Sequence, residues 1–240
     1  MSSNSKLSSL ITSGAESLGI SLPNAAVGAF QAYYRLLEKI GSNVNLTAVA
    51  GEGDVAKLHF LDSIALLTVA DFKGAHVLDI GSGAGFPGVP LKIAEPSISL
   101  TLLDASAKRI SFLTELCETL DIEAQCIHAR AEEFINEPAN RESRDIVVSR
   151  AVARLNQLSE LCLPFVKIGG IFIAMKSTDS DDEISGAASA LNTLGAKLSH
   201  CIDYDIPATN IKHRAVIMQK IAETPPKYPR RFARIQKAPL

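Results

Sequence analysis

The stretch Val77-Leu-Asp-Ile-Gly-Ser-Gly-Ala-Gly-Phe-Pro-Gly88 is the most informative part of the sequence. Its first four residues form a short apolar run typical of a buried strand, and Pro87 is well placed to begin a helix. Between a strand and a helix N-terminus, glycine-rich backbone can approach an anionic or carboxylate ligand without a Cβ clash. The stretch therefore predicts a ligand-binding loop, and the alternative is a tight turn that binds nothing.

Two cofactor classes use such a loop. Gly83-x-Gly85-x-x-Gly88 matches the dinucleotide fingerprint of nicotinamide-dependent oxidoreductases. Counted from Gly81, the first glycine after the strand, the pattern is G-x-G-x-G, because Phe86 stands where that fingerprint needs its third glycine. This register resembles the first motif of class I S-adenosylmethionine-dependent methyltransferases. We therefore expect Gly81, Gly83 and Gly85 to bind S-adenosyl-L-methionine.

Strand-like and helical patterns alternate after about residue 75. Short β-branched apolar runs occupy 77–80, 100–103, 146–148 and 171–175, and helical patterns lie between them at 108–119, 155–166 and 183–194. This alternation predicts parallel β-α-β units, and two runs without an intervening helix, near 197–205 and 213–220, predict an antiparallel edge hairpin. Together with the glycine motif, the pattern implies an α/β fold of the class I methyltransferase type, Rossmann-like, with a mostly parallel seven-stranded sheet.

The sequence before this region has a helical pattern. We expect a first helix around Leu7, Leu10 and Ile11, a second from Pro23 to Gly41, and a third from about residue 54 to 67 with Asp54 as its N-cap. The prediction is one compact domain in three parts: a helical N-terminal extension (1–70), a methyltransferase core (71–223) and a basic tail (224–240).

Charged residues stand where three of the strands are expected to end, which is where open α/β sheets bind ligands. Asp104 ends the second strand and can accept hydrogen bonds from ribose hydroxyls, although it could instead cap the next helix. Residues 130–133 follow the third strand, which is expected between the runs 100–103 and 146–148. They lie where an adenine edge would be, or they form the acidic first turn of a helix. Arg150 follows the fourth strand, on the reactive side of the sheet, unless it only makes a surface ion pair.

Composition excludes several classes of protein. Of 240 residues, 47% are hydrophobic and 21% charged, which fits a globular protein with a sizeable core rather than a disordered chain. No apolar run approaches the roughly 20 residues of a membrane span. Four widely spaced cysteines and five scattered histidines lack metal-ligand spacing, so we expect no metal, buried reduced thiols and structural histidines in a cytoplasmic protein. No P-loop or Ser-His-Asp order is present.

The formal net charge of −2 hides an uneven distribution. The tail carries five positive and no negative side chains, so residues 1–223 carry −7. The tail also contains Tyr228 and Phe232, which could stack on bases, as in single-stranded nucleic acid-binding proteins. We expect an RNA-binding tail, and the alternative is a solvated basic terminus. The predicted RNA contacts are Lys227, Tyr228, Arg230, Arg231, Arg234 and Lys237.

From about Leu36 to Leu240 the chain resembles the bacterial 16S ribosomal RNA guanine-N7 methyltransferases, also called the glucose-inhibited division protein B family. The segments that carry the resemblance are Asn45-Leu-Thr-Ala48, His59-Phe-Leu-Asp-Ser63, the glycine stretch through Leu91, Arg130-Ala-Glu-Glu133, Ser149-Arg-Ala-Val-Ala153, and Pro226-Lys-Tyr-Pro-Arg-Arg231 with Lys237 and Pro239-Leu240. The long Phe-Pro-Gly-Val-Pro continuation of the glycine motif makes it more specific than G-x-G-x-G alone.

The resemblance implies cofactor contacts at Gly81, Phe86, Ala131, Glu132 and Arg150, with Asp104 added from its position. Three departures stand out: no Trp precedes Asn-Leu-Thr, Leu58 replaces a basic residue before His59, and Ala233 and Ile235 replace glycine and proline in the tail. The first is expected to affect packing, and the other two RNA contacts.

The implied reaction is methyl transfer from S-adenosylmethionine to N7 of a specific guanine in the decoding region of 16S ribosomal RNA, free or in the small ribosomal subunit, by a monomer. N7 carries a lone pair and no proton, so no general base is needed, and Arg150 is expected to position cofactor or base rather than move a proton. The alternatives are a methyltransferase acting on another RNA, a protein or a small molecule, a nicotinamide-dependent oxidoreductase, and a non-catalytic RNA-binding module.

Overall fold

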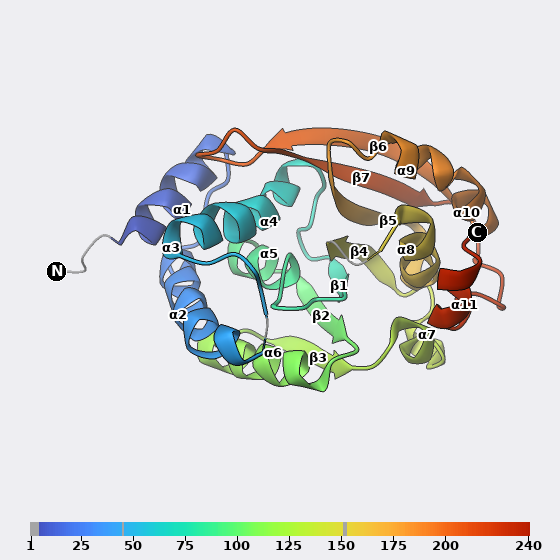
Figure 1. Cartoon of the computed structure of the whole chain (residues 1–240), viewed down its shortest axis with the longest axis horizontal. Coiled ribbons are helices and arrows are strands. Elements are labelled where there is room, and N and C mark those ends of the chain that lie inside the picture. Colours follow the sequence, from blue (N-terminus) through green and yellow to red (C-terminus); the bar gives the residue numbers. More distant parts are fainter. Residues whose placement is uncertain (1–4, 45, 151–152) are drawn as a thin grey trace.

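The computed structural model describes residues 5–44, 46–150 and 153–240, and a seven-stranded sheet forms its centre (Figure 1). The spatial order of the strands is β3-β2-β1-β4-β5-β7-β6, with β7 antiparallel to both of its neighbours and the other pairs parallel. The strands are β1 His76–Ile80, β2 Ser99–Asp104, β3 Ala124–His128, β4 Arg144–Arg150, β5 Val166–Ser177, β6 Ala196–Asp205 and β7 Lys212–Lys220. The predicted parallel sheet with an antiparallel edge hairpin is confirmed.

Helices cover both faces of this sheet. The longer ones are α1 Lys6–Ser17, α2 Ala26–Val44, α6 Ala107–Leu120 and α8 Leu155–Cys162. The shorter ones are α3 Glu52–Val55, α4 Asp62–Ile64, α5 Gly88–Ala94, α7 Ala131–Phe134, α9 Asp181–Gly186, α10 Ala188–Thr193 and α11 Phe232–Lys237, with the helical turns η1 Ala56–Leu61, η2 Ala65–Thr68, η3 Pro138–Asn140 and η4 Leu163–Phe165.

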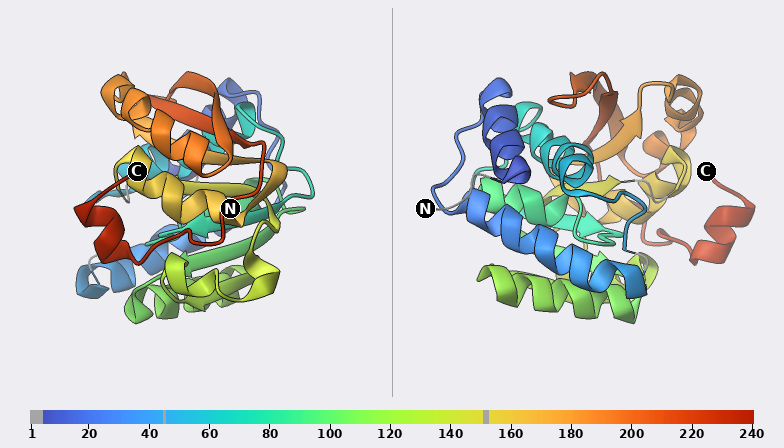
Figure 2. Two further views of the ribbon diagram at one scale, coloured as in Figure 1. Left: turned by 90° about the vertical axis from the view of Figure 1, so that its right-hand side faces the viewer. Right: turned by 60° about the vertical axis from the view of Figure 1, so that its left-hand side comes forward.

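Alternating side chains of the strands divide the core into two layers. Val77 of β1 packs with side chains of α1, α2, α5 and α6 on one face of the sheet. Leu78 and Ile80 face the other way and pack with α7, α8, α10 and α11 (Figure 2). The N-terminal helices thus share one hydrophobic core with the sheet, while the division of the chain into three parts stays a prediction.

Several predicted boundaries are wrong. Helix α2 begins at Ala26, three residues after Pro23, and continues past Gly41 to Val44. Asp54 lies inside α3, whose N-cap is Gly51, and its carboxylate pairs with Lys57 at 2.9 Å. Asp54 reads locally as a cap, but the chain starts its helix two residues earlier.

The cysteines differ from each other in exposure. All four are free, and Cys117 and Cys162 are buried as expected. Cys126 is half-buried and Cys201 on the edge strand β6 is exposed, so the expectation of four buried thiols is wrong. Edge strands present one face to solvent, which a short apolar run does not reveal.

The described residues form no helix long and apolar enough to cross a membrane. They also contain no cluster of three or more His, Cys, Asp or Glu side chains able to hold a metal ion.

A buried carboxylate joins β1 to the N-terminus of α5. Asp79 is fully buried, and its Oδ2 accepts a hydrogen bond of 2.9 Å from the backbone N–H of Gly88. A Cβ at Gly88 would lie 2.8 Å from that oxygen, so only glycine allows this approach. Oδ1 has no hydrogen-bond partner, and burial raises the pKa of Asp79 to about 7.

We expect Asp79→Asn to remove a pH dependence of stability. Between about pH 4 and 7 the folded protein holds a proton on Asp79 that the unfolded chain has lost, so stability falls as pH rises through this range. Urea unfolding measures the effect. Between pH 5 and 6.5, the free energy of unfolding of the original protein should decline by up to about 1.4 kcal/mol per pH unit relative to that of Asp79→Asn.

Asp182→Asn, at an exposed position on α9, is the matched control and should leave the profile unchanged. Parallel profiles for Asp79→Asn and the original protein would show that this carboxyl does not titrate near neutrality.

Candidate cofactor-binding site

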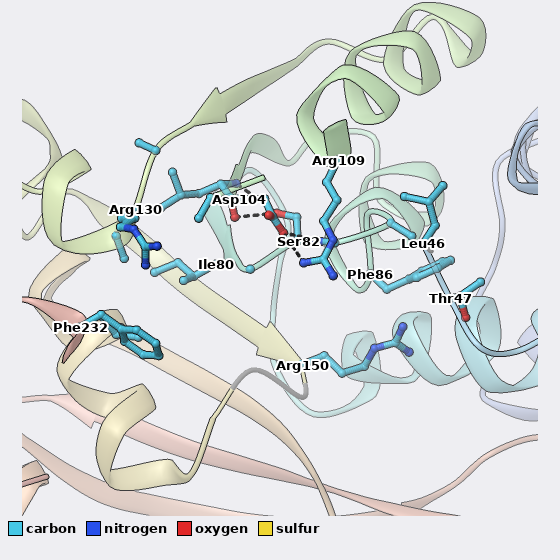
Figure 3. Close-up of a pocket in the computed structure, with 18 of the residues that line it drawn as sticks. Leu46, Thr47, Ile80, Ser82, Phe86, Asp104, Arg109, Arg130, Arg150 and Phe232 are labelled. Carbon is cyan, nitrogen blue, oxygen red and sulfur yellow. Dashed lines mark hydrogen bonds and ion pairs between the residues drawn. The ribbon is translucent and has the colours of Figure 1, made fainter. Parts of the chain in front are cut away.

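A cavity of about 470 Å³ opens at the carboxyl ends of β1, β2 and β4 and just beyond the end of β3 (Figure 3). Its walls come from segments far apart in the sequence: Leu46, Thr47, His59, Ile80–Ala84, Phe86, Leu103–Ala105, Arg109, Ala129–Glu132, Arg150, Leu161 and Phe232. Phe86, Thr47 and Arg150 lie at one end, Asp104 lies in the middle, and Arg130, Ile80 and Phe232 lie at the other end (Figure 3).

The glycine loop forms the floor of the cavity. Gly81 and Gly83 have φ angles of 72° and 58°, a left-handed conformation that favours glycine. The Gly81 N–H donates to the carbonyl of Leu103 at 2.8 Å, which ties the loop to β2. Both glycines line the cavity, in agreement with their predicted position.

Gly85 does not line the cavity, and its predicted contact with the cofactor has no support from the geometry. A Cβ at Gly85 would lie 2.5 Å from the Tyr33 hydroxyl and 3.0 Å from a Val89 methyl group. Its N–H donates to the carbonyl of Ser82 at 2.7 Å, so it is already used within the loop. Gly85 is required because α2 packs against the loop there.

Asp104 lies at the centre of the cavity and organises the backbone around it. Its Oδ2 accepts from the Gly83 N–H at 2.9 Å and from Arg109 Nη1 at 3.4 Å, and its Oδ1 accepts from the Ser106 N–H at 2.8 Å. The N-cap of α6 is Ser106 rather than Asp104. The carboxylate therefore braces both the glycine loop and the start of α6, and it remains on the cavity wall.

Three groups hold the Arg150 guanidinium at the end of the cavity that Phe86 and Thr47 also line. Its Nη1 donates to the Leu58 carbonyl at 3.2 Å and to Asp62 Oδ2 at 3.3 Å, and its Nη2 lies 3.1 Å from His59 Nδ1. The guanidinium carbon lies 4.9 Å from the centroid of the Phe86 ring, within the range of a cation–π contact. The ion pair of Arg150 is thus buried in the wall of the cavity and is not the surface pair weighed as the alternative.

His59, which like the other histidines was expected to be structural, lines the cavity. Its ring stacks on Phe86 with 4.4 Å between centroids. Burial and the nearby Arg150 charge lower the pKa of His59 to about 4, so the ring is neutral at neutral pH. In the tautomer with the proton on Nε2, Nδ1 accepts from Arg150 and Nε2 donates to Thr47 Oγ1 at 2.6 Å; in the other tautomer Nδ1 donates to the Leu58 carbonyl at 3.0 Å and Nε2 accepts from Thr47.

Asp62 connects Arg150 to the edge hairpin. The carboxylate is fully buried, and its Oδ1 accepts from the Tyr204 hydroxyl and from His213 Nδ1, each at 2.9 Å. The carboxylate raises the pKa of His213. One side chain therefore joins the N-terminal helices, β4, β6 and β7 behind the cavity.

The other end of the cavity is more apolar. Ala131 and Glu132 begin α7 directly after the end of β3, and Ile80, Leu103 and Leu161 add buried aliphatic surface. Residues 131–134 form α7 with an acidic first turn, and Arg130, Ala131 and Glu132 line the cavity, while their position beside an adenine edge stays a prediction.

The tail is folded against the sheet rather than free. Lys227, Arg231, Arg234 and Lys237 are exposed, as an RNA-binding role requires. Tyr228 is only 7% exposed and packs in the core, so the expectation that it stacks on a base is corrected. Arg230 is corrected too, because its guanidinium is committed to the fully buried Glu160, with 2.6 Å between Nη2 and Oε2.

Sequence reasoning missed several residues of the cavity wall. Leu46, Thr47 and His59 lie in two segments that carry the family resemblance. The sequence therefore marked these segments but did not show that they reach the cavity. Arg109, Leu161 and Phe232 gave no signal as cavity residues, because each lies on a helix and reaches the site only through packing. Asn45, Ala151 and Val152, which belong to matching segments, lie outside the described residues.

The residues present fit S-adenosylmethionine. Its ribose needs a hydrogen-bond acceptor such as Asp104, its amino acid part needs backbone without side chains, and its adenine needs flat apolar walls. The cavity provides a glycine loop in one direction from Asp104 and apolar walls in the other, and its volume lies in the range of small-molecule sites.

Comparisons with known proteins agree with this geometry. A family model described as rRNA small subunit methyltransferase G matches residues 27–211. The ribosomal RNA small subunit methyltransferase G of Acetivibrio thermocellus is 41% identical over 98% of this chain and 97% of its own length. That of Pelotomaculum thermopropionicum is 42% identical over 98% of this chain and 100% of its own length.

Solved structures with low sequence identity share the fold. A SAM-dependent methyltransferase from Aquifex aeolicus has a TM-score of 0.53 at 16% identity, covering 70% of this chain and 93% of its own. A ribosomal protein L11 methylase from Lactobacillus delbrueckii subsp. bulgaricus has a TM-score of 0.51 at 14% identity, covering 69% and 79%. On the match to the family model and these near full-length relatives, the chain belongs to the rRNA small subunit methyltransferase G family.

Proposed function

We propose that this protein transfers a methyl group from S-adenosylmethionine to N7 of one guanine in the decoding region of 16S ribosomal RNA. The observation that carries the proposal is the cavity, which combines a glycine loop, a central carboxylate and an end formed by an arginine and an aromatic ring. Family membership supports the RNA substrate and argues against the nicotinamide-dependent alternative.

The chemistry of N7 methylation agrees with the residues at the Arg150 end. When bound, S-adenosylmethionine supplies a methyl group already activated by a sulfonium charge. N7 offers an in-plane lone pair and no proton, so the chain needs to align groups rather than to remove a proton. His59, held neutral beside Arg150, adds no positive charge near a ring that becomes cationic.

The cofactor contacts we propose are Gly81, Gly83, Phe86, Asp104, Ala131, Glu132 and Arg150, all of which line the cavity. Asp104 would accept from the ribose, and Arg150 would position the cofactor or the target base. N7 lies on the major-groove edge, which A-form RNA hides from side chains, so the guanine must be unpaired or flipped.

For RNA we propose contacts by the exposed cations of the tail, Lys227, Arg231, Arg234 and Lys237. They lie on the segment whose Phe232 borders the cavity, so RNA bound to them would be near the reacting end of the sheet. The protein would act as a monomer in the cytoplasm, on ribosomal RNA or the small ribosomal subunit.

The experiment that tests the proposed function uses labelled S-adenosylmethionine and ribosomal small subunits that lack the modification. We expect label in 7-methylguanosine after digestion of 16S ribosomal RNA. A reaction with subunits already modified is the control and should incorporate little label. Label in another nucleoside or in protein would contradict the proposal.

A second prediction concerns Arg150→Lys. Lysine keeps the charge but lacks the planar pair of nitrogens that bonds to Leu58, Asp62 and His59, so cofactor affinity and methyl transfer should each fall by roughly tenfold, or about 1.4 kcal/mol. The fold should persist, because Asp62 keeps its bonds from Tyr204 and His213. Isothermal titration calorimetry and initial rates measure the effect, and unchanged values in both would refute the positioning role.

A third prediction concerns the tail cations. Because each phosphate contact releases counterions, Arg231→Ala with Arg234→Ala should weaken RNA binding and reduce the slope of log affinity against log salt by up to about 2. The charge-matched control is Lys73→Ala with Lys197→Ala, exposed cations that do not line the cavity. Equal effects of the two double variants would show that the tail has no special contact with RNA.

A further inference from the structure

The C-terminal segment reaches the cavity itself. Phe232, the first residue of α11, lines the cavity beside Ile80 and Leu161, although it lies 100 residues after Glu132 on the same wall. Its side chain is half-buried, and Figure 3 shows its ring at the end of the cavity that also holds Arg130 and Ile80. We propose that Phe232 is a cofactor-binding residue whose ring forms a wall for the adenine of S-adenosylmethionine.

An ion pair with the buried Glu160 fixes the chain two residues before Phe232. The backbone N–H and the Nε of Arg230 both donate to Glu160 Oε1 at 2.8 Å, and Nη2 donates to Oε2 at 2.6 Å. Glu160 is fully buried on α8, next to the cavity residue Leu161. A buried carboxylate satisfied in this way holds the segment at one place on the cavity rim.

Two further contacts fix the segment at and after Phe232. The backbone N–H of Phe232 donates to Glu132 Oε1 at 3.1 Å, and Ile235, one turn later, is fully buried. Glu132 is itself a proposed cofactor contact, so Phe232 and the start of α7 are joined by a direct hydrogen bond. The ring is therefore placed by a supported backbone and not by a free terminus.

The chemistry of this end selects an adenine rather than the amino acid part of the cofactor. Asp104 lies in the middle of the cavity, and the glycine loop and Arg150 extend from it in one direction. In the other direction Ile80, Leu103, Ala131, Leu161 and Phe232 form apolar walls that suit the faces of a flat heterocycle, and the charged Arg130 and Glu132 line the same end. The inference rests on the proposed function, because it assumes that the cavity holds this cofactor.

The test measures binding of S-adenosylhomocysteine and of adenosine by calorimetry, without RNA or turnover. Phe232→Ala should weaken both ligands roughly tenfold, since loss of one aromatic stacking partner has an effect of this order. Phe232→Tyr should restore most of the affinity. Gln236→Ala, at an exposed position on the same helix that does not line the cavity, is the matched control and should bind both ligands normally.

Point substitution is preferable to deleting the tail, because deletion would leave Glu160 buried without its partner. If Phe232→Ala lowers the melting temperature of the free protein, Phe232→Leu keeps the apolar volume and should still bind adenosine more weakly than the original protein. If Phe232→Ala and Phe232→Leu both bind adenosine with unchanged affinity, the role of Phe232 is overturned and the proposed function is not affected. Failure of the original protein to bind S-adenosylhomocysteine would contradict the proposed function and this inference with it.

Discussion

Two buried carboxylates hold the backbone between β1 and α5. Asp79 accepts from the N–H of Gly88 at the start of α5, and Asp104 accepts from the N–H of Gly83 within the loop. A Cβ at Gly88 would collide with Asp79, and the left-handed φ of 58° at Gly83 favours glycine there. The shape of the cavity floor depends on these two contacts, because they set how closely a ligand can approach the main chain.

A third buried carboxylate, Asp62, performs a similar task for the opposite wall. It gathers Arg150, Tyr204 and His213 from three strands onto one helix end. A charge buried in this way is costly to leave unpaired. The arrangement therefore favours the position in which the Arg150 guanidinium lies above the ring of Phe86. The N-terminal helices therefore contribute to the site by orienting an arginine as well as by covering the sheet.

The tail combines two kinds of residue that alternate along a short segment. Arg230 and Ile235 anchor it to the core, while Arg231 and Arg234 face solvent. Composition alone made the whole segment look like a free basic arm. Arg230 is anchored rather than free because Glu160, buried on α8, requires a partner. The sequence does not reveal this pairing, since the two residues are seventy positions apart.

The mostly parallel sheet, the edge hairpin, the glycine loop and the position of Asp104 at a strand end could be predicted, because each depends on local periodicity or on residues close in sequence. Helix ends such as Gly41 and Asp54 were misplaced, since local signals compete with packing. The sequence by itself determined the fold class, the family and the cofactor. Only the tertiary structure decided that Gly85 packs against Tyr33, that His59 and Phe232 line the cavity, and that Arg230 pairs with the buried Glu160. These facts depend on contacts between distant segments, and a linear pattern carries no information about which distant side chains meet.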